Sequence, residues 1–357
     1  MAFGDILWPA VAVADGANMS RIGNNNTPFG VKEDNCLEGN QGIYKIYEFL
    51  GEGTYGKVAK CRKLWSQKFY AIKIMKSDRA GLREMETMTL IKHLDPDQNH
   101  LVRMHECFSF KNMTCIVYEI LAESLHNYLC KHPNPIHLCH IRVIAQNLLK
   151  ALRAIGDLGL AHCDIKLDNI MFREPNCANV KLIDFGLALK TEELATMVKI
   201  QVTPFRAPEV ILGLYPLDKS VDMWALGVVL ACIYYGQYPF PYHTEYDTIR
   251  AMVQIFGLPE PKVLCMAIGF DEVIEVHHRM FGQHDVDDHI VFTDLLKRML
   301  EVNPQKRITP SQALTHDFIT MNHLSGEIKK KKKKIVENKK IFQHGTPSTC
   351  HLKTVSI

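Results

Sequence analysis

The feature that most constrains how this chain folds is a change in its hydrophobic pattern near residue 122. From Tyr44 onward, short runs rich in Tyr, Phe, Val and Ile alternate with turn residues, a pattern typical of a small antiparallel sheet. One helical stretch, from about Ala80 to Leu94, interrupts these runs. Beyond Ser124 the apolar residues recur at helical spacing. This order predicts an α+β fold with two lobes, a small antiparallel β lobe followed by a larger α-helical lobe.

A long helix is the clearest element expected in the second half. Its apolar face consists of Ile141, Ala145, Leu148, Leu152 and Ile155. These residues follow one another at steps of four, three, four and three, so they share one side of a helix. Further helices are predicted at Ser220–Tyr235, Tyr246–Phe256, Phe292–Leu300 and Pro310–Leu314.

Composition and pattern divide the chain into four segments. Residues 1–42 are rich in Gly, Asn and Asp and lack periodicity, which predicts a flexible N-terminal segment. The β lobe is expected over residues 43–121 and the helical lobe over residues 122–323. Residues 324–357 form a Lys-rich tail. In such proteins, small-molecule sites are often found between the lobes.

The composition indicates a soluble globular protein. Hydrophobic residues make up 47% and charged residues 23%, which excludes collagen, a coiled coil and disorder throughout. The longest apolar run, Ala225 to Tyr235, is too short to cross a bilayer. No basic region precedes the first apolar stretch, so we expect no signal peptide. The 11 cysteines form no CxxC pair, which favours reduced thiols in the nucleus or the cytoplasm, or both.

The net charge of +3 hides an asymmetry. Nine Lys against two Glu give residues 325–357 a charge of +7, which leaves −4 for the rest of the chain. Direct nucleic-acid binding by the folded part is therefore not expected. The run Lys329 to Lys340 has four interpretations: a nuclear import signal, a nucleic-acid contact, a membrane-surface contact, or a solvated charge run. The membrane is the weakest, because no hydrophobic or lipidation motif accompanies the run.

A glycine-rich motif follows the first predicted strand of the β lobe. It comprises Gly51, Glu52, Gly53, Thr54, Tyr55, Gly56, Lys57 and Val58. Its three glycines lack a Cβ, so the backbone can approach phosphate groups closely. An ordinary glycine-rich turn would show the same residues. A dinucleotide-binding fold would continue into a helix, whereas a strand follows here, which favours a hairpin that covers a nucleotide.

Lys73 lies at the centre of the apolar run AIKIM. Burying a lysine is costly unless a carboxylate or a phosphate pairs with it. Glu84 and Glu86 in the following helix both qualify as its partner. Glu84 is preferred because it lies beside the expected apolar stripe of that helix, and Glu86 stays an alternative.

The strongest signal is HCDIKLDN, residues 162–169, followed by IDFG, residues 183–186. Phosphoryl transfer needs a carboxylate that orients the attacking hydroxyl, and a lysine that neutralises the transferred group. Asp164 and Lys166 fit these catalytic roles. Phosphoryl transfer also needs an amide and a second carboxylate to hold Mg²⁺ against the nucleotide, and Asn169 and Asp184 fit these roles. Loop residues that merely cap helices would match this spacing only by several coincidences.

With these motifs the chain resembles a eukaryotic protein kinase from about Tyr44 to His323. The segments LGLAHCDIKLDNIMF, APEVILGLYP and EYDTIRAMVQIFGLP are similar to the homeodomain-interacting protein kinases, relatives of the DYRK kinases within the CMGC group. The resemblance implies a Glu209–Arg307 ion pair and an Asp222 that anchors the catalytic loop. The DIKLDN pattern around Lys166 resembles serine/threonine-specific kinases.

The resemblance also implies a nucleotide site for ATP with Mg²⁺. Leu50, Val58 and Ala71 would sandwich the adenine, although ordinary sheet packing also explains them. Tyr118 would stand at the back of the pocket, and the backbone of Glu119 and Leu121 would bind the base edge. Protein substrates with Ser or Thr would be phosphorylated, and transcription regulators are partners that the family suggests.

Three residues depart from the family pattern. Cys163 replaces the arginine that usually precedes the catalytic aspartate. Lys199 stands where relatives carry an activation-loop tyrosine, and Thr203 replaces an arginine that favours proline after the phosphoacceptor. We therefore predict that basal activity does not depend on loop phosphorylation. Two alternatives stay open: a pseudokinase scaffold, and a nucleic-acid-binding protein driven by the tail.

Overall fold

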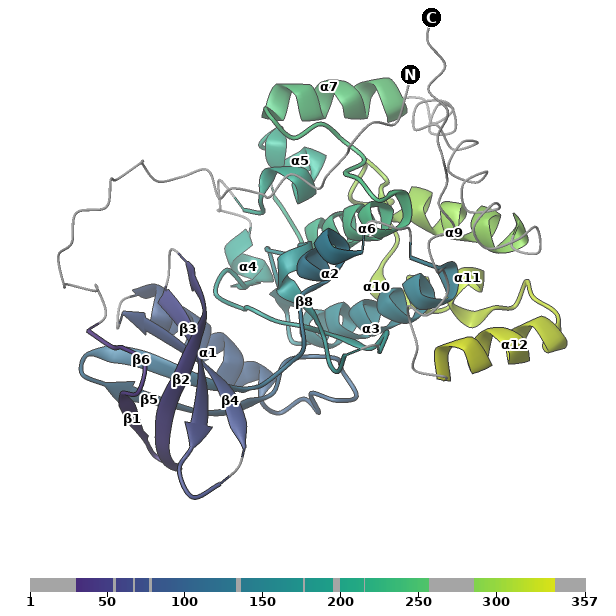
Figure 1. The fold of residues 1–357 in the computed structure, drawn as a ribbon. Coiled ribbons are helices and arrows are strands. Elements are labelled where there is room, and N and C mark those ends of the chain that lie inside the picture. The colour runs from purple at the N-terminus through teal and green to yellow at the C-terminus, as the bar shows by residue number, and fades with distance from the viewer. Residues whose placement is uncertain are drawn as a thin grey trace, which may run out of the picture.

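The computed structural model describes two lobes joined by the segment that follows residue 119 (Figure 1). The described residues are 30–53, 56–66, 68–76, 79–132, 136–175, 177–194, 200–214, 216–256 and 286–337. Thr54, Tyr55 and Lys199 therefore lie outside the described part, as do residues 1–29 of the N-terminal segment and residues 338–357 of the Lys-rich tail. The predicted α+β architecture with a small β lobe and a larger helical lobe is confirmed.

The N-terminal lobe contains an antiparallel sheet of six strands in the order β1-β2-β3-β4-β6-β5. The strands are β1 (Cys36–Gly39), β2 (Gly42–Gly53), β3 (Gly56–Lys63), β4 (Phe69–Lys76), β5 (Met104–Phe110) and β6 (Met113–Glu119). Strand β1 differs from the expectation, because it lies within residues 1–42, which the sequence predicts to be a flexible N-terminal segment. Its register against β2 places Leu37 opposite Tyr44, and both side chains are buried in the core of the lobe.

Helix α1 (Arg79–Ile91) lies beside this sheet and contacts β6. Met88 and Ile91 are buried against the lobe, and Glu84 lies on the same side, one turn before Met88. The sequence predicts a helix that continues to about Leu94, but the helix ends at Ile91. The helix therefore presents one carboxylate towards the sheet within an otherwise apolar face.

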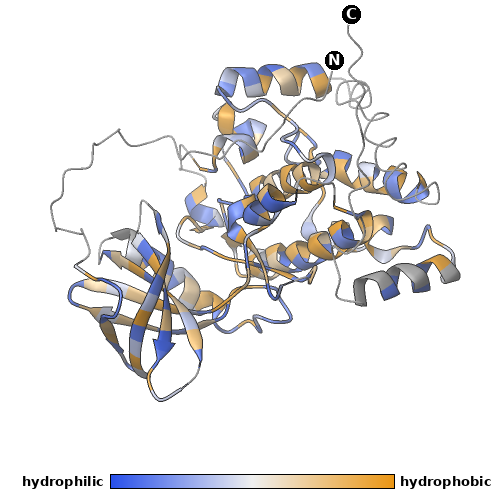
Figure 2. Cartoon of the chain, viewed as in Figure 1, coloured by the Kyte–Doolittle hydropathy of each residue, from blue (hydrophilic) through white to orange (hydrophobic). Residues whose placement is uncertain are grey.

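The C-terminal lobe is built around two long helices, α3 (Leu138–Asp157) and α6 (Ser220–Tyr235). Helix α6 is apolar around nearly its whole circumference, which Figure 2 shows as a largely orange ribbon, and its residues 221–234 are buried. It ends at Gly236, whose φ of 71° is the left-handed conformation that glycine adopts readily. Around this pair lie α2 (Leu125–Lys131), α4 (Thr191–Leu194), α5 (Pro208–Ile211), α7 (Glu245–Phe256), α9 (Val286–Met299), α10 (Pro310–Leu314) and α11 (Asp317–Thr320).

Short elements near the junction of the lobes carry the HCDIKLDN and IDFG motifs. Strand β8 (Ile170–Phe172) pairs with β9 (Val180–Leu182), and β7 (Leu160–Ala161) pairs with β10 (Leu189–Lys190). A 3₁₀ turn at Leu167–Asn169 joins β7 to β8, and a second one lies at Thr203–Phe205. These pairings bring residues 162–169 and 183–186 together.

The Lys-rich segment contains a helix, α12 (Gly326–Glu337), beyond the last helix that the sequence predicts. The helix contacts α3 and lies away from the β lobe (Figure 1). Lysines have good helix propensity, and packing against α3 stabilises the helical conformation.

Among the described residues, no helix has both the length and the apolar character needed to cross a membrane.

Candidate active site

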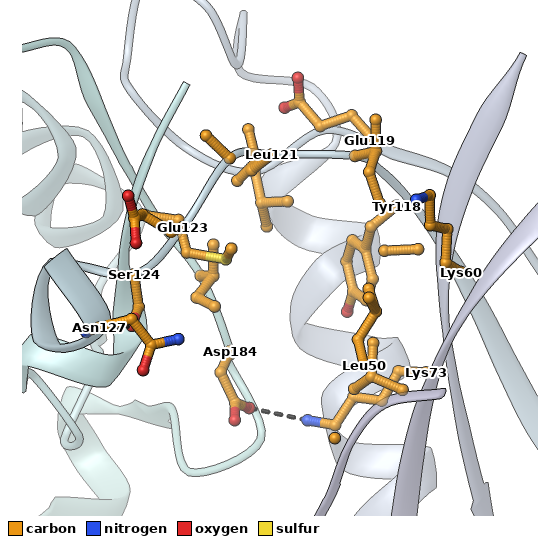
Figure 3. Close-up of a pocket in the computed structure, with 18 of the residues that line it drawn as sticks. Leu50, Lys60, Lys73, Tyr118, Glu119, Leu121, Glu123, Ser124, Asn127 and Asp184 are labelled. Carbon is orange, nitrogen blue, oxygen red and sulfur yellow. Dashed lines mark hydrogen bonds and ion pairs between the residues drawn. The ribbon is translucent and has the colours of Figure 1, made fainter. Parts of the chain in front are cut away.

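A cavity of about 540 Å³ lies between the sheet and the helical lobe (Figure 3). Nine of its lining residues are among the predicted nucleotide- and metal-binding residues: Leu50, Gly51, Val58, Ala71, Lys73, Glu84, Glu119, Leu121 and Asp184. Its volume falls in the range of small-molecule sites. Apolar residues from the sheet and from the junction segment face it, so the cavity suits a flat ring with a charged tail.

The charged end of the cavity contains Lys73, Glu84 and Asp184. The Lys73 Nζ lies 2.7 Å from Glu84 Oε2 and 2.8 Å from Asp184 Oδ1, as the dashed line in Figure 3 shows for the second contact. Burial lowers the pKa of Lys73, but the two carboxylates outweigh it and the net pKa is raised. For Asp184 the effects have the opposite sign. Burial raises the pKa of its carboxyl group, but Lys73 and the hydrogen bond from the Gly186 amide outweigh burial, so the net pKa is lowered. The lysine and Asp184 are therefore both charged at neutral pH.

The structure distinguishes the two candidate partners of Lys73. Glu84 is 1% exposed and pairs with the lysine, whereas Glu86 is exposed to solvent. The second oxygen of Glu84 accepts a hydrogen bond of 3.0 Å from the Tyr118 hydroxyl. Burial is the largest influence on Glu84 and raises its pKa in spite of the nearby lysine. Tyr118 therefore holds the carboxylate from the back of the cavity.

The backbone of the loop that carries Asp164 is held in place by hydrogen bonds to Asp222. Both oxygens of Asp222 accept backbone hydrogen bonds, from His162 N at 2.6 Å and from Cys163 N at 2.9 Å. Cys163 adopts a φ of 64°, a left-handed conformation that is strained for a residue with a side chain. The buried carboxylate of Asp222 offsets this strain, and it fixes the direction in which Asp164 leaves the loop.

Asp164, Lys166 and Asn169 form a compact group. The Asp164 Oδ2 accepts hydrogen bonds of 2.8 Å from Lys166 Nζ and of 2.8 Å from Asn169 Nδ2. A further 2.8 Å bond runs from Asn169 Nδ2 to the Asp164 carbonyl. The Asp164 Oδ1 is buried and has no hydrogen-bond partner among the described residues. An unpaired carboxylate oxygen in a buried position is suited to accept a hydrogen bond from a ligand hydroxyl.

The predicted metal ligands fit a hard cation. Asn169 turns its amide nitrogen towards Asp164, and Lys73 and the Gly186 amide both contact Asp184 Oδ1. The Asn169 Oδ1 and the Asp184 Oδ2 therefore take no part in these contacts. Oxygen ligands of this kind are those that Mg²⁺ prefers, together with phosphate oxygens and water. The described residues contain no cluster of three or more His, Cys, Asp or Glu side chains that would hold a metal without a nucleotide.

The glycine-rich hairpin covers the cavity from the β lobe. Gly53 and Gly56 are opposite each other where β2 and β3 meet. A Cβ on Gly56 would lie only 2.2 Å from the Ile74 carbonyl oxygen, so glycine is required at this position. Lys57 and Glu52 form an ion pair of 3.2 Å across the hairpin, and neither lines the cavity. These two residues therefore shape the hairpin in the structure.

Two ionic groups support the site from outside the cavity. Arg307 forms a bidentate pair with Glu209, with distances of 2.6 Å and 2.9 Å, and both side chains are buried. Behind the junction segment, the Glu119 carboxylate binds the buried Lys181 at 2.6 Å, and Lys181 also contacts Asp97 at 2.8 Å. The sequence analysis includes the first pair but misses the second.

Several lining residues were missed by the sequence analysis. They are Lys60, Val102, Ile120, Ala122, Glu123, Ser124, Asn127, Met171 and Ile183. Ile183 is the first residue of the IDFG motif and Met171 follows Asn169 by two residues, so their proximity to Asp184 and Asn169 was a usable signal. Val102 gave no such signal, because its position in the cavity depends on the isolated bridge of Leu101 with Leu182.

The fold and the site together define a protein kinase. Residues 44–319 match the protein kinase domain, and the chain belongs to this family. It is 34% identical over 335 residues to homeodomain-interacting protein kinase 1 of Mus musculus. It is 33% identical over 350 residues to homeodomain-interacting protein kinase 1 of Caenorhabditis elegans, and 29% identical over 368 residues to serine/threonine-protein kinase ppk15 of Schizosaccharomyces pombe.

These alignments cover most of the chain but not most of its relatives. They include 79% of the chain with the mouse protein, 81% with the nematode protein and 87% with the yeast protein. The chain spans 28% of the mouse relative, 41% of the nematode relative and 68% of the yeast relative. The predicted relation to the homeodomain-interacting kinases is thereby confirmed for the kinase region.

Proposed function

We propose that this chain is an active serine/threonine protein kinase that transfers the γ-phosphoryl group of ATP to hydroxyl groups of protein substrates. The observation that carries this proposal is the buried, unpartnered Oδ1 of Asp164 beside Lys166 and Asn169. A hydroxyl nucleophile needs an acceptor at this place, and a lysine beside it neutralises the transferred group. Membership of the protein kinase family and the similarity to ppk15 support the same activity.

In this proposal each predicted residue has a distinct task. Asp164 orients the substrate hydroxyl and Lys166 steadies the γ-phosphoryl group. Asn169 and Asp184 hold Mg²⁺, which neutralises negative charge on the phosphates when it is bound.

The nucleotide is held by the remaining site residues. Lys73, which Glu84 positions, contacts the α- and β-phosphates. Leu50, Val58 and Ala71 enclose the adenine, and the backbone of Glu119 and Leu121 binds its edge. The hairpin of residues 51–58 covers the phosphates, and its glycines let the backbone approach them closely.

A pseudokinase scaffold is the competing function, and it is favoured by Cys163 in the place of the usual arginine and by the altered activation-loop sequence. The two functions predict different results when the purified chain is incubated with γ-labelled ATP, Mg²⁺ and a generic protein substrate. A kinase incorporates label on Ser and Thr of the substrate, and chelation of Mg²⁺ abolishes the incorporation. A scaffold binds ATP or a partner but leaves the substrate unlabelled.

We further propose that the substrates include transcription regulators and that the chain enters the nucleus. The name homeodomain-interacting protein kinase of the mouse and nematode relatives supports the first point, and the run of lysines at residues 329–334 supports the second. Fluorescence imaging of the chain and of a variant with Lys330, Lys333 and Lys334 changed to Gln tests the location. An unchanged distribution between compartments would contradict nuclear import by this run.

A further inference from the structure

Arg206 holds the segment that precedes α5. Its side chain is buried, with 8% of the side-chain surface exposed. The Nε donates a hydrogen bond of 3.1 Å to the Ile200 carbonyl, and the Nη2 donates one of 2.6 Å to the Gln201 carbonyl. The Nη1 pairs with the carboxylate of Glu245, the first residue of α7. One guanidinium thus connects residues 200–201 to another helix of the lobe.

The same segment is bonded to the catalytic loop. Gln201 N donates a hydrogen bond of 3.2 Å to the Cys163 carbonyl, directly before Asp164 in the chain. The Gln201 side chain donates to the Val221 carbonyl at 2.9 Å and accepts from Ala207 N at 2.9 Å. The φ of Gln201 is 64°, a conformation that persists only where the surroundings impose it. The position of residues 200–207 and that of the catalytic loop are therefore coupled.

Charge balance identifies Glu245 as the group on which this arrangement depends. Backbone carbonyls solvate a guanidinium but leave its charge uncompensated, and a buried cation without an anion is strongly unfavourable. The Glu245 carboxylate, with 44% of its side chain exposed, supplies the negative charge from outside the segment. Cys163 adds no cation where relatives carry an arginine, and burial, which raises the pKa of its thiol well above the ordinary value, keeps it neutral. The positive charge of Arg206 is thus balanced by Glu245 without a phosphate group.

We propose that Glu245 is a positioning residue whose carboxylate, through Arg206, holds residues 200–207 in the arrangement that receives the protein substrate, in place of a phosphate on the activation loop. This inference rests on the proposed kinase function. It states which group carries the charge that a phosphorylated residue carries in other kinases. It also accounts for a loop in which the usual phosphotyrosine position is a lysine.

Steady-state kinetics of the full chain after phosphatase treatment test this proposal. Glu245→Gln should lower kcat/KM for a serine peptide by about tenfold or more, and should change the KM for ATP by less than about twofold. The reason for the split is that Arg206 contacts residues 200 and 201, which the proposal assigns to the protein substrate, and none of the residues that line the nucleotide cavity. Glu245→Asp keeps the charge and should restore kcat/KM to within about threefold of the wild type.

The matched control is Glu192→Gln, which removes an exposed carboxylate from α4, the helix that precedes residues 200–207 in the chain. This variant should behave as the wild type. Equal kcat/KM for the peptide in Glu245→Gln and wild type would overturn the proposal, as would an equal rise of both KM values. A loss of wild-type activity of about tenfold on phosphatase treatment would also overturn it, because a phosphate would then carry the charge.

Amide hydrogen exchange separates this inference from the kinase function, since it needs no turnover. Amides of residues 200–207 should exchange about tenfold faster in Glu245→Gln than in wild type, while those of α6 stay unchanged. If the wild type transfers no phosphate but shows this exchange pattern, the kinase function is wrong and the positioning by Glu245 stands. If exchange in residues 200–207 is the same in both proteins, the positioning is wrong.

Discussion

At the scale of single residues, the partner of Lys73 is decided by the phase of helix α1. Glu84→Gln keeps the shape of the side chain but leaves the buried lysine with a weaker partner on that side. We expect kcat/KM to fall by about tenfold or more, equivalent to ~1.4 kcal/mol in the barrier. Glu86→Gln removes an exposed carboxylate two residues away and should leave kcat/KM unchanged. Parallel assays with one peptide decide the matter, and equal losses in both variants would contradict the assignment.

Much of the site could be predicted at this scale because its charged residues are close in sequence to strong motifs. Asp164, Lys166 and Asn169 lie in one loop, so the spacing alone indicates their proximity. The Asp97–Lys181–Glu119 group could not be predicted in this way. Its members come from three separate elements, and only the packing of the two lobes brings their side chains together.

At the scale of elements, helix α3 carries a buried titratable group. Burial lowers the pKa of His140 to about 4, against about 6.5 in an unfolded chain. His140 thus binds a proton less readily in the folded state than in the unfolded state. Its contribution to the free energy of unfolding is therefore fully present above pH 6.5 and is lost as the pH falls towards 4. The loss should reach about 2 kcal/mol by pH 5.

The comparison of His140→Phe with wild type checks this pH dependence. Urea unfolding at pH 7 and at pH 5 should show a smaller decrease in the free energy of unfolding for the variant. His93→Gln, at an exposed position after α1, is the control and should follow the wild type. Identical pH slopes for wild type and His140→Phe would mean that other groups dominate the acid response.

The Glu209–Arg307 pair fixes α5 against the loop that precedes α10. Arg307→Leu leaves a buried carboxylate without its partner and should lower the free energy of unfolding by about 3–5 kcal/mol. Arg298→Leu breaks an exposed pair with Asp294 on α9 and should cost only about 0.5 kcal/mol. Urea titrations measure both variants. The double change of Glu209 and Arg307 to Leu should recover part of the loss, whereas an undiminished loss would show that the charge is not its cause.

The elements themselves were predictable where their pattern is long and regular. The apolar face of α3 and the nearly all-apolar α6 are of this kind. Strand β1 was missed because four residues that include a glycine are too short for an alternating pattern. Helix α12 was missed because six consecutive lysines have no amphipathic period, and its contact with α3 is a tertiary effect.

At the scale of the whole molecule, catalysis and the basic segment are separate. Helix α12 contacts α3 and no residue of it lines the nucleotide cavity. Deletion of Lys329–Lys340 should therefore leave kcat/KM for a short peptide within about twofold of the wild type. The alternative of a nucleic-acid-binding protein driven by the tail predicts binding that depends steeply on salt and vanishes with the same deletion. A large loss of peptide turnover would show that the helix supports the catalytic lobe.

The central claim is that Asp164 acts on the substrate hydroxyl while the nucleotide is held by other residues. Asp164→Asn tests it most directly, with transfer of labelled phosphate and ATP binding measured on the same purified protein. We expect transfer to a protein substrate to fall by about a thousandfold or more. The affinity for ATP with Mg²⁺ should stay within about threefold of the wild type, because Lys73 and Asp184 are untouched. Turnover at the wild-type rate in Asp164→Asn would contradict the account.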